Sequence, residues 1–170
     1  MNATKVRDTT ALVEIGLTRE VTWRVANDYY MHFGKEYPFG INFVFASGPE
    51  EPEVGELTAM LSEYFEPPTD EELLSAVDSS TSVEQRRENL TRLGVGASTV
   101  EDPRYREKIV EAMRSSDERV REAGLWAALW ALWPQILPEI DSMNKNDANP
   151  VLRAQAGALA GWMRREGITP

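Results

Sequence analysis

The chain has 170 residues and no cysteine, and its 18 Lys and Arg stand against 28 Asp and Glu, a formal net charge of −10 at pH 7. This length is enough to bury a core, and the lack of cysteine excludes disulfides, thiolate metal sites and a cysteine nucleophile. The longest apolar run, 125–133, is far shorter than the ~20 residues of a membrane-spanning helix. With no apolar signal segment at its start, the chain is expected in the cytoplasm, away from membranes.

Residues 1–49 allow two interpretations. Val21, Trp23 and Val25 alternate with polar residues, which is typical of a strand. The stretch 18–34 also fits a helix, because a capping Thr and a terminal Gly bracket a segment of helical length. We favour the helix here. A short strand or an extended buried segment is then indicated by Ile41, Phe43 and Phe45.

Negative charge is concentrated in the first half of the chain. Residues 1–80 hold 5 Lys and Arg and 15 Asp and Glu, a balance of −10, whereas residues 81–170 hold 13 of each. Within 50–78 there are ten carboxylates and no cation. This acidic segment is either a solvated, solubilising surface or a docking surface for a basic protein, and in both cases it repels nucleic-acid phosphates.

Two helices are predicted within the acidic segment. The first covers 54–65, where an apolar stripe leaves the acids on the outer face. The stripe consists of Leu57, Met60, Leu61, Tyr64 and Phe65. After two prolines, Thr69 and Glu72 match a capping box that starts a short helix through Val77. A docked partner is expected to contact Glu50, Glu51, Glu53, Glu56 and Glu63.

The C-terminal half shows helical spacing with clear starts and stops. Ser82 with Gln85 resembles a capping box, for a helix that ends near Gly94. Asp117 and Asn149 are the expected N-caps of two later helices. The remaining predictions are helices over 103–114, 118–133 and 150–165, with a short helix around 136–143.

Two stretches of this half repeat each other. Residues 117–124, with the sequence Asp-Glu-Arg-Val-Arg-Glu-Ala-Gly, match residues 149–156 at a spacing of 32. Each has a capping residue, an aliphatic residue three positions later, then Arg and small residues. Periods of 20–50 residues are typical of stacked helical repeats. A degraded third copy is found at 82–90, with Arg86 in the Arg position.

These residues resemble the HEAT repeats, over about 81–165. In that family each repeat is an antiparallel helix pair, and its second helix begins Asp-x-x-Val-Arg-x-x-Ala. The resemblance implies structural roles for Asp117, Arg121 and Arg153, as a ladder between neighbouring repeats. It also implies a scaffold or binding module, although a few relatives are enzymes or enzyme subunits.

Three tryptophans are spaced to share a helix face. Trp126, Trp130 and Trp133 lie at i, i+4 and i+7, within a segment that is apolar on every side. Such a helix is either sandwiched in the core or keeps one face for a partner. Both interpretations stay open, and the three are candidate partner-binding residues because Trp is a favoured interface anchor.

No pattern indicates catalysis, a cofactor or a metal. The lone histidine, His32, is more typical of a packed or surface residue than of a general base. One His without Cys makes a zinc site improbable. The basic cluster is interleaved with acids, as in a salt-bridged face, so no nucleic-acid binding is expected. It comprises Arg86, Arg87, Arg92, Arg104, Arg106 and Lys108.

The predicted fold is therefore mainly α, a HEAT-like right-handed stack with an irregular N-terminal cap that includes at most a short β segment. Residues 1–80 are expected to form an acidic region packed on repeats at 81–170. The expected function is non-catalytic binding of a basic protein, as in a small acidic inhibitor or immunity-type protein. The alternative is an enzyme or enzyme accessory subunit built on HEAT-like repeats.

Overall fold

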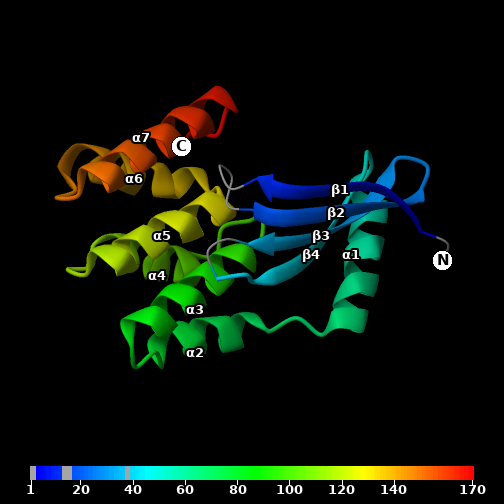
Figure 1. The fold of residues 1–170 in the computed structure, drawn as a ribbon, viewed down its shortest axis with the longest axis horizontal. Coiled ribbons are helices and arrows are strands. Elements are labelled where there is room, and N and C mark those ends of the chain that lie inside the picture. Colours follow the sequence, from blue (N-terminus) through cyan, green and yellow to red (C-terminus); the bar gives the residue numbers. More distant parts are fainter. Residues whose placement is uncertain (1–2, 13–16, 37–38) are drawn as a thin grey trace. The chain divides into compact units, whose positions relative to one another are not determined.

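The computed structural model describes residues 3–12, 17–36 and 39–170, and the chain divides into two compact units at Pro68/Thr69. The first unit, 1–68, contains a β-sheet and one helix, and the second unit, 69–170, contains helices (Figure 1). Each unit is described by itself. The division falls before the predicted boundary at 80/81, because the short helix after the two prolines packs with the helices that follow it.

The first unit is built on an antiparallel sheet with strand order β1-β2-β3-β4. The strands are β1 (Thr4–Leu12), β2 (Leu17–Ala26), β3 (Tyr29–Glu36) and β4 (Asn42–Ser47). A two-residue turn joins β2 to β3, and its Asn27 adopts a left-handed conformation with φ 35°. Asn tolerates this conformation better than most residues, so Asn27-Asp28 is a local signal for the hairpin.

The prediction of a helix over 18–34 is wrong. Val21, Trp23 and Val25 lie on β2, as their alternation indicates, and the antiparallel pairing of β2 with β3 satisfies the backbone of both segments. Gly34, the expected helix end, lies inside β3 and is covered by the ring of Phe43 from β4. A Cβ at position 34 would stand 2.2 Å from that ring. The prediction of a strand around Phe43 and Phe45 is confirmed.

Helix α1 (Glu51–Phe65) follows β4 and packs against it, with Leu57 and Leu61 buried. Figure 1 shows α1 lying crosswise to the strands. The rest of the predicted apolar stripe is not buried. Met60, Tyr64 and Phe65 are exposed, and Tyr64 reaches 80%.

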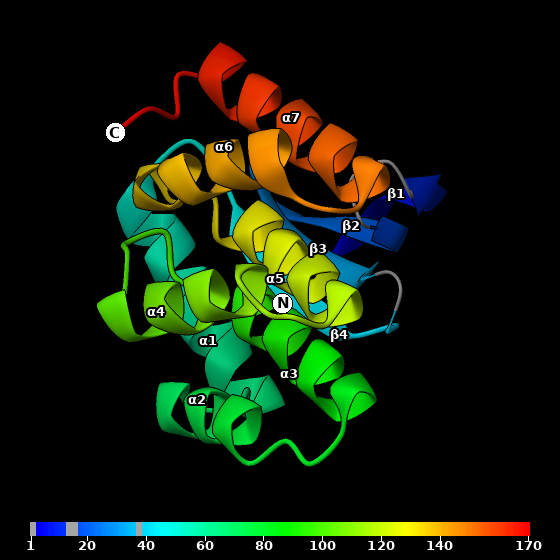
Figure 2. The same cartoon turned by 90° about the vertical axis from the view of Figure 1, so that its left-hand side faces the viewer.

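The second unit consists of successive helix pairs. They are α2 (Asp70–Asp78) with α3 (Val83–Val95), α4 (Pro103–Met113) with α5 (Glu118–Ala131), and α6 (Leu137–Asn146) with α7 (Pro150–Arg165). A 3-10 turn, η2 (Pro134–Ile136), precedes α6. Figure 2 shows α2, α4 and α6 in one layer and α3, α5 and α7 in the other. Thr69 and Glu72 form the predicted capping box, and Asp117 and Asn149 cap their helices.

The predicted fold class is corrected by the first unit. A four-stranded antiparallel sheet with its own helix replaces the irregular cap with a short β segment, so the chain is mixed α and β. Because 18–34 was interpreted as a helix, the prediction lacked β2 and β3, and the fold class was wrong for this reason. The core of the second unit is continuous and includes Leu90, Ile109, Ile140 and Met163.

Candidate functional site

The first half of the acidic segment forms one flank of α1. Glu53, Glu56, Met60, Glu63 and Tyr64 lie at i, i+3, i+7, i+10 and i+11, so they share one side of the helix. We call this set the acidic flank. Its ends are ten residues apart between the two outer glutamates, about 15 Å at 1.5 Å per residue.

The other two predicted contact residues lie elsewhere on the helix. Glu51 is on the opposite side of α1, and Glu50 is its N-cap residue and makes no side-chain cap bond. Both are exposed. Burial raises the pKa of Tyr29, and the nearby Glu53 and Glu50 carboxylates raise it further. The structure thus brings together three of the five predicted acids.

Carboxylates of α1 have no cationic partner among the described residues. None of the six acids of α1 and its two cap positions forms an ion pair with a described residue. They are Glu50, Glu51, Glu53, Glu56, Glu63 and Glu66. Acids in the first turn favour a helix, because they face the positive end of its dipole. Glu63 and Glu66 are at the other end, where negative charge is unfavourable and the last turn has no basic residue. Helix stability therefore does not account for them.

Apolar side chains accompany these charges. Tyr64 and Phe65 stack edge to face at the end of α1, with ring centroids 5.0 Å apart. Tyr64 is on the side of Leu57 and Leu61, but the core does not cover this last turn. The flank therefore combines uncompensated negative charge with exposed aromatic and thioether surface.

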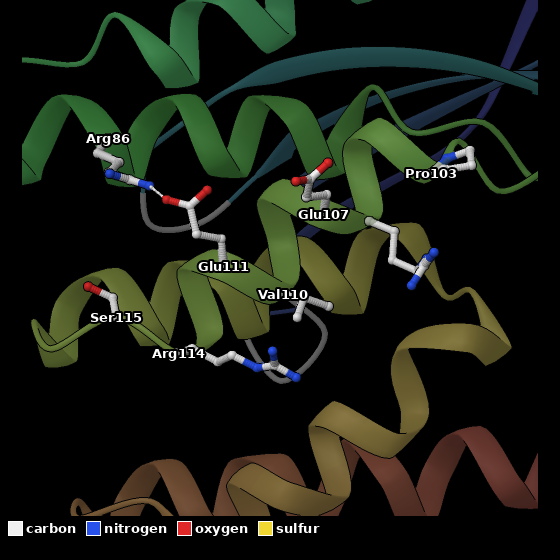
Figure 3. Close-up of a pocket in the computed structure, with 8 residues that line it drawn as sticks. Arg86, Pro103, Glu107, Val110, Glu111, Arg114 and Ser115 are labelled. Atoms are coloured by element: carbon white, nitrogen blue, oxygen red, sulfur yellow. Dashed lines mark hydrogen bonds and ion pairs between the residues drawn. The ribbon is translucent and has the colours of Figure 1, made fainter.

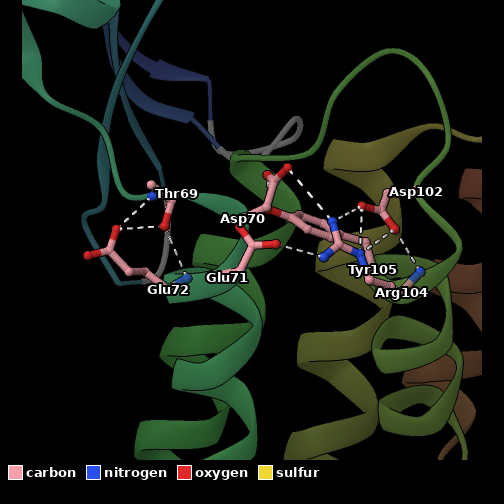
Figure 4. Close-up of polar contacts among 7 residues, drawn as sticks. All are labelled: Thr69, Asp70, Glu71, Glu72, Asp102, Arg104 and Tyr105. Atoms are coloured by element: carbon pink, nitrogen blue, oxygen red, sulfur yellow. Dashed lines mark hydrogen bonds and ion pairs between the residues drawn. The ribbon is translucent and has the colours of Figure 1, made fainter.

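The second half of the acidic segment is paired within its own unit (Figure 4). Arg104 of α4 bonds to Glu71 at 2.9 Å and also to Asp102, and the Tyr105 hydroxyl donates to Asp70 at 2.8 Å. Lys108 bonds to Asp78 at 2.5 Å. The pKa of Glu71 is lowered, mainly by its hydrogen bond from Arg104. These acids stabilise contacts between helices and are not free for a partner.

The basic cluster is paired throughout, as its interleaving with acids predicts. Arg86 contacts Glu111 at 2.7 Å beside a hollow of about 660 Å³ (Figure 3). Arg106 pairs with Glu101, and Arg114, which also lines the hollow, pairs with Glu139. The remaining members pair with acids as well: Arg87 with Glu122, Arg92 with Glu88, Arg104 with Asp102, and Lys108 with Asp78. The hollow therefore presents no excess of positive charge.

The three tryptophans do not share a helix face. Helix α5 ends at Ala131, and Leu132 turns the chain with a left-handed φ of 53° ahead of Pro134. Trp133 therefore leaves the helix and enters the core, where it is 2% exposed and donates from Nε1 to the Ser98 carbonyl at 2.8 Å. Its assignment as a contact residue is corrected. Trp126 and Trp130 remain on α5 and are partly buried.

Equivalent arginines of the repeated stretches make equivalent contacts. Arg121 donates from Nη1 to the Ser115 carbonyl at 3.1 Å, and Arg153 donates from Nη1 to the Asp147 carbonyl at 2.6 Å. In both cases the acceptor lies six residues earlier, in the loop before the helix. The Asp147 carboxylate also accepts from Arg121, at 2.7 and 3.1 Å. Asp147 therefore links the two stretches.

Asp147 is not among the residues expected from the sequence, where the resemblance to HEAT repeats placed the ladder acid at Asp117. The available signal was its spacing, because Asp147 precedes the second N-cap by two residues, as Ser115 precedes the first. The Asp147 side chain is 3% exposed and that of Arg121 is 14% exposed. The hydrogen bond from Arg121 lowers the pKa of Asp147. These residues hold the helix pairs together and touch no candidate site.

Among the described side chains, no group of three or more His, Asp and Glu is arranged to hold a metal ion. The helices of residues 3–12, 17–36 and 39–170 are all too short or too polar to cross a membrane. Comparison with protein-family models finds no match for the chain, and neither do searches of the curated proteins and of the solved structures.

Proposed function

We propose that the protein binds a basic protein partner through the acidic flank of α1. The observation that supports this is the set of α1 carboxylates with no ion pair to any described residue, beside an exposed Tyr64. The ten carboxylates of the acidic segment divide into two groups. Four of them bond within their own unit, and the other six form no ion pair with a described residue. Only the second group is available to compensate charge on another molecule.

The combination of acids with apolar side chains specifies the chemistry of the partner. Lys and Arg side chains lay their alkyl stems on apolar surface and keep the charged head free for a carboxylate. Tyr64 offers such a surface, and its ring face also attracts a cation. Met60, between Glu56 and Glu63 in sequence, adds an adaptable apolar contact. A helix or strand with several Lys or Arg fits this flank.

The proposed role is that of a cytoplasmic acidic inhibitor or immunity-type protein, which neutralises its partner by covering a basic surface. In this proposal the protein binds no nucleic acid and no membrane. The repeated helix starts support the proposal that residues 81–165 are related to HEAT repeats and serve as a scaffold. The equivalent contacts of Arg121 and Arg153 favour that relationship.

Site-specific cross-linking tests the binding surface. A photoreactive amino acid replaces Met60 in one variant and Val151 of α7 in the other, both exposed positions. Each variant is irradiated in a lysate of the source cells, and the adducts are identified by mass spectrometry. We expect position 60 to capture one predominant protein, with an isoelectric point above 9. Position 151 should not capture that protein.

Charge steering supplies the second criterion. Association of the purified partner with the full chain should slow at least tenfold between about 50 and 500 mM salt, because steering acts mainly on the association rate. An adduct common to both positions, or an association rate insensitive to salt, contradicts the proposal.

A further inference from the structure

Three polar side chains lie in a chain on one face of the sheet. His32 on β3 is paired with Thr22 on β2 and with Phe45 on β4. Side chains alternate along a strand, so Glu20 and Ser47, each two residues away from those partners, are on the same face as His32. Glu20 and Ser47 therefore flank His32 from opposite neighbouring strands.

Hydrogen bonds join all three. His32 Nδ1 is 2.9 Å from Glu20 Oε1, and His32 Nε2 is 2.8 Å from Ser47 Oγ. An ionised carboxylate only accepts hydrogen bonds, so the proton of a neutral imidazole is on Nδ1. Nε2 then has a free lone pair, and the Ser47 hydroxyl must donate to it. This is the tautomer that a general base requires.

The imidazole is held in place by its surroundings. Its ring stacks on Phe45 with centroids 4.3 Å apart and an interplanar angle of 3°. The hydroxyl of the buried Thr22 lies 3.3 Å from Nδ1, so it contacts the same edge of the ring as Glu20. The His32 and Glu20 side chains are 14% and 15% exposed. A fixed ring keeps Nε2 directed at Ser47.

We propose that Ser47 is a nucleophile activated by His32, with Glu20 as the positioning residue, and that the substrate class is carboxylic esters. The Ser47 oxygen attacks the ester carbonyl carbon while its proton passes to His32 Nε2. The C–O bond to the alcohol breaks, and His32 returns the proton to the leaving alkoxide. Water then attacks the acyl-Ser47 ester, again giving a proton to His32, and the carboxylic acid is released with the Ser47 hydroxyl restored.

The surroundings of Ser47 favour an ester with an apolar acyl group. Ser47 is the last residue of β4, and the exposed Gly48-Pro49 loop follows it. Phe45 is 42% exposed, and Tyr30 pairs with Ser47 across the strands. Tyr30 and Phe45 therefore occupy positions next to Ser47 on the same face of the sheet. This proposal goes beyond the binding function and replaces the expectation that the chain has no catalytic residue.

Covalent labelling of the full chain tests the proposal. A fluorophosphonate probe forms a bond from serine oxygen to phosphorus and releases fluoride, and peptide mapping locates the label. We expect one label on Ser47, and hydrolysis of p-nitrophenyl acetate that falls at least tenfold in Ser47→Ala and His32→Gln. Glu20→Gln should lower the rate while leaving the labelled position unchanged. The exposed Ser116→Ala is the control and should behave like the unmodified chain.

The label map of the unmodified chain is by itself enough to overturn the proposal. A label spread over several serines, or absent from Ser47, shows an ordinary hydroxyl in a structural polar network. Equal labelling of Ser47 in the unmodified chain and in His32→Gln has the same meaning. Circular dichroism of each variant separates loss of chemistry from loss of the sheet, and the mapped site does not depend on any variant.

Discussion

The two halves of the acidic segment have similar composition and different surroundings. In α2, Asp78 lies at the C-terminal end of the helix, where negative charge is unfavourable, and Lys108 compensates it at 2.5 Å. In α1, Glu63 and Glu66 lie at the same kind of position and pair with no described cation. Two acidic stretches without a cation thus form internal contacts in one unit and an open surface in the other.

The paired and the unpaired carboxylates have different physical roles. A paired carboxylate contributes to the free energy of folding, and its loss is measured on the protein alone. An unpaired exposed carboxylate contributes little to folding, and its effect is measured on a complex. Substitutions that separate folding from binding therefore test the comparison.

The largest effect is expected at the ion pair whose carboxylate is buried. Arg121→Ala leaves the Asp147 carboxylate buried without its cation, so the free energy of unfolding should fall by about 3 to 5 kcal/mol. Thermal and urea unfolding measure the loss. Arg119→Ala is the matched control, because Arg119 is two residues away on α5 and its ion pairs are exposed. Equal losses in the two variants would show that burial does not decide the value of these pairs.

The second-largest effect on stability is expected from a buried carboxylate of the sheet. Glu36 is fully buried at the end of β3, and burial raises its pKa from 4.5 to about 7 against hydrogen bonds from the backbone of Phe39 and Ile41. The folded state then holds a proton that the unfolded chain releases between pH 4.5 and 7. Stability should fall as pH rises through this window, by roughly 3 kcal/mol in total.

Hydrogen exchange of the β3 amides at pH 5 and pH 8 measures this change. Glu36→Gln should remove most of the pH dependence, since the amide does not titrate. Glu63→Gln, at an exposed position, should leave it unaltered. A β3 stability that rises with pH in the unmodified chain would contradict the inferred burial of the proton.

Sequence patterns identified the second unit well because its signals are local. The capping box of Thr69 and Glu72 and the caps Asp117 and Asn149 lie within a few residues of the backbone groups they satisfy. The sheet depends on pairing between distant strands, which a sequence window does not contain. Gly34 shows the difference. In the sequence it resembles a helix end, whereas in the structure it lies inside β3 and is covered by the ring of Phe43.

The candidate site was predictable in part. The acids of α1 could be named from charge alone, but their separation from those of α2 depends on Arg104 and Lys108, about thirty residues further along. Trp133 matched the helical spacing of Trp126, and the left-handed Leu132 breaks that spacing. Ser47 could not be associated with His32, because a strand register decides their distance.

Charge reversal on α1 should change binding with little change in folding. The variant Glu53→Lys, Glu56→Lys, Glu63→Lys places three repelling charges on the acidic flank, so affinity for the cross-linked partner should fall at least tenfold. Its thermal stability should stay close to that of the unmodified chain. The control reverses Glu107, Glu118 and Glu166, three exposed acids of the second unit. Equal loss in both variants would mean that net charge matters and the flank does not.

The smallest effect concerns a single exposed pair of α2. The hydrogen bond from Arg104 is the largest cause of the lowered pKa of Glu71, and its charge adds to it. In Arg104→Ala the pKa of Glu71 should therefore rise toward its ordinary value, as carbon-detected NMR titration of the carboxyl measures. A lowered pKa gives stability that is present above the unfolded value and is lost as pH falls. The unmodified chain should therefore lose this contribution on acidification, and the variant should lose less. A titration of Glu71 that is identical in both proteins would show that the α2 acids are as unpaired in solution as those of α1.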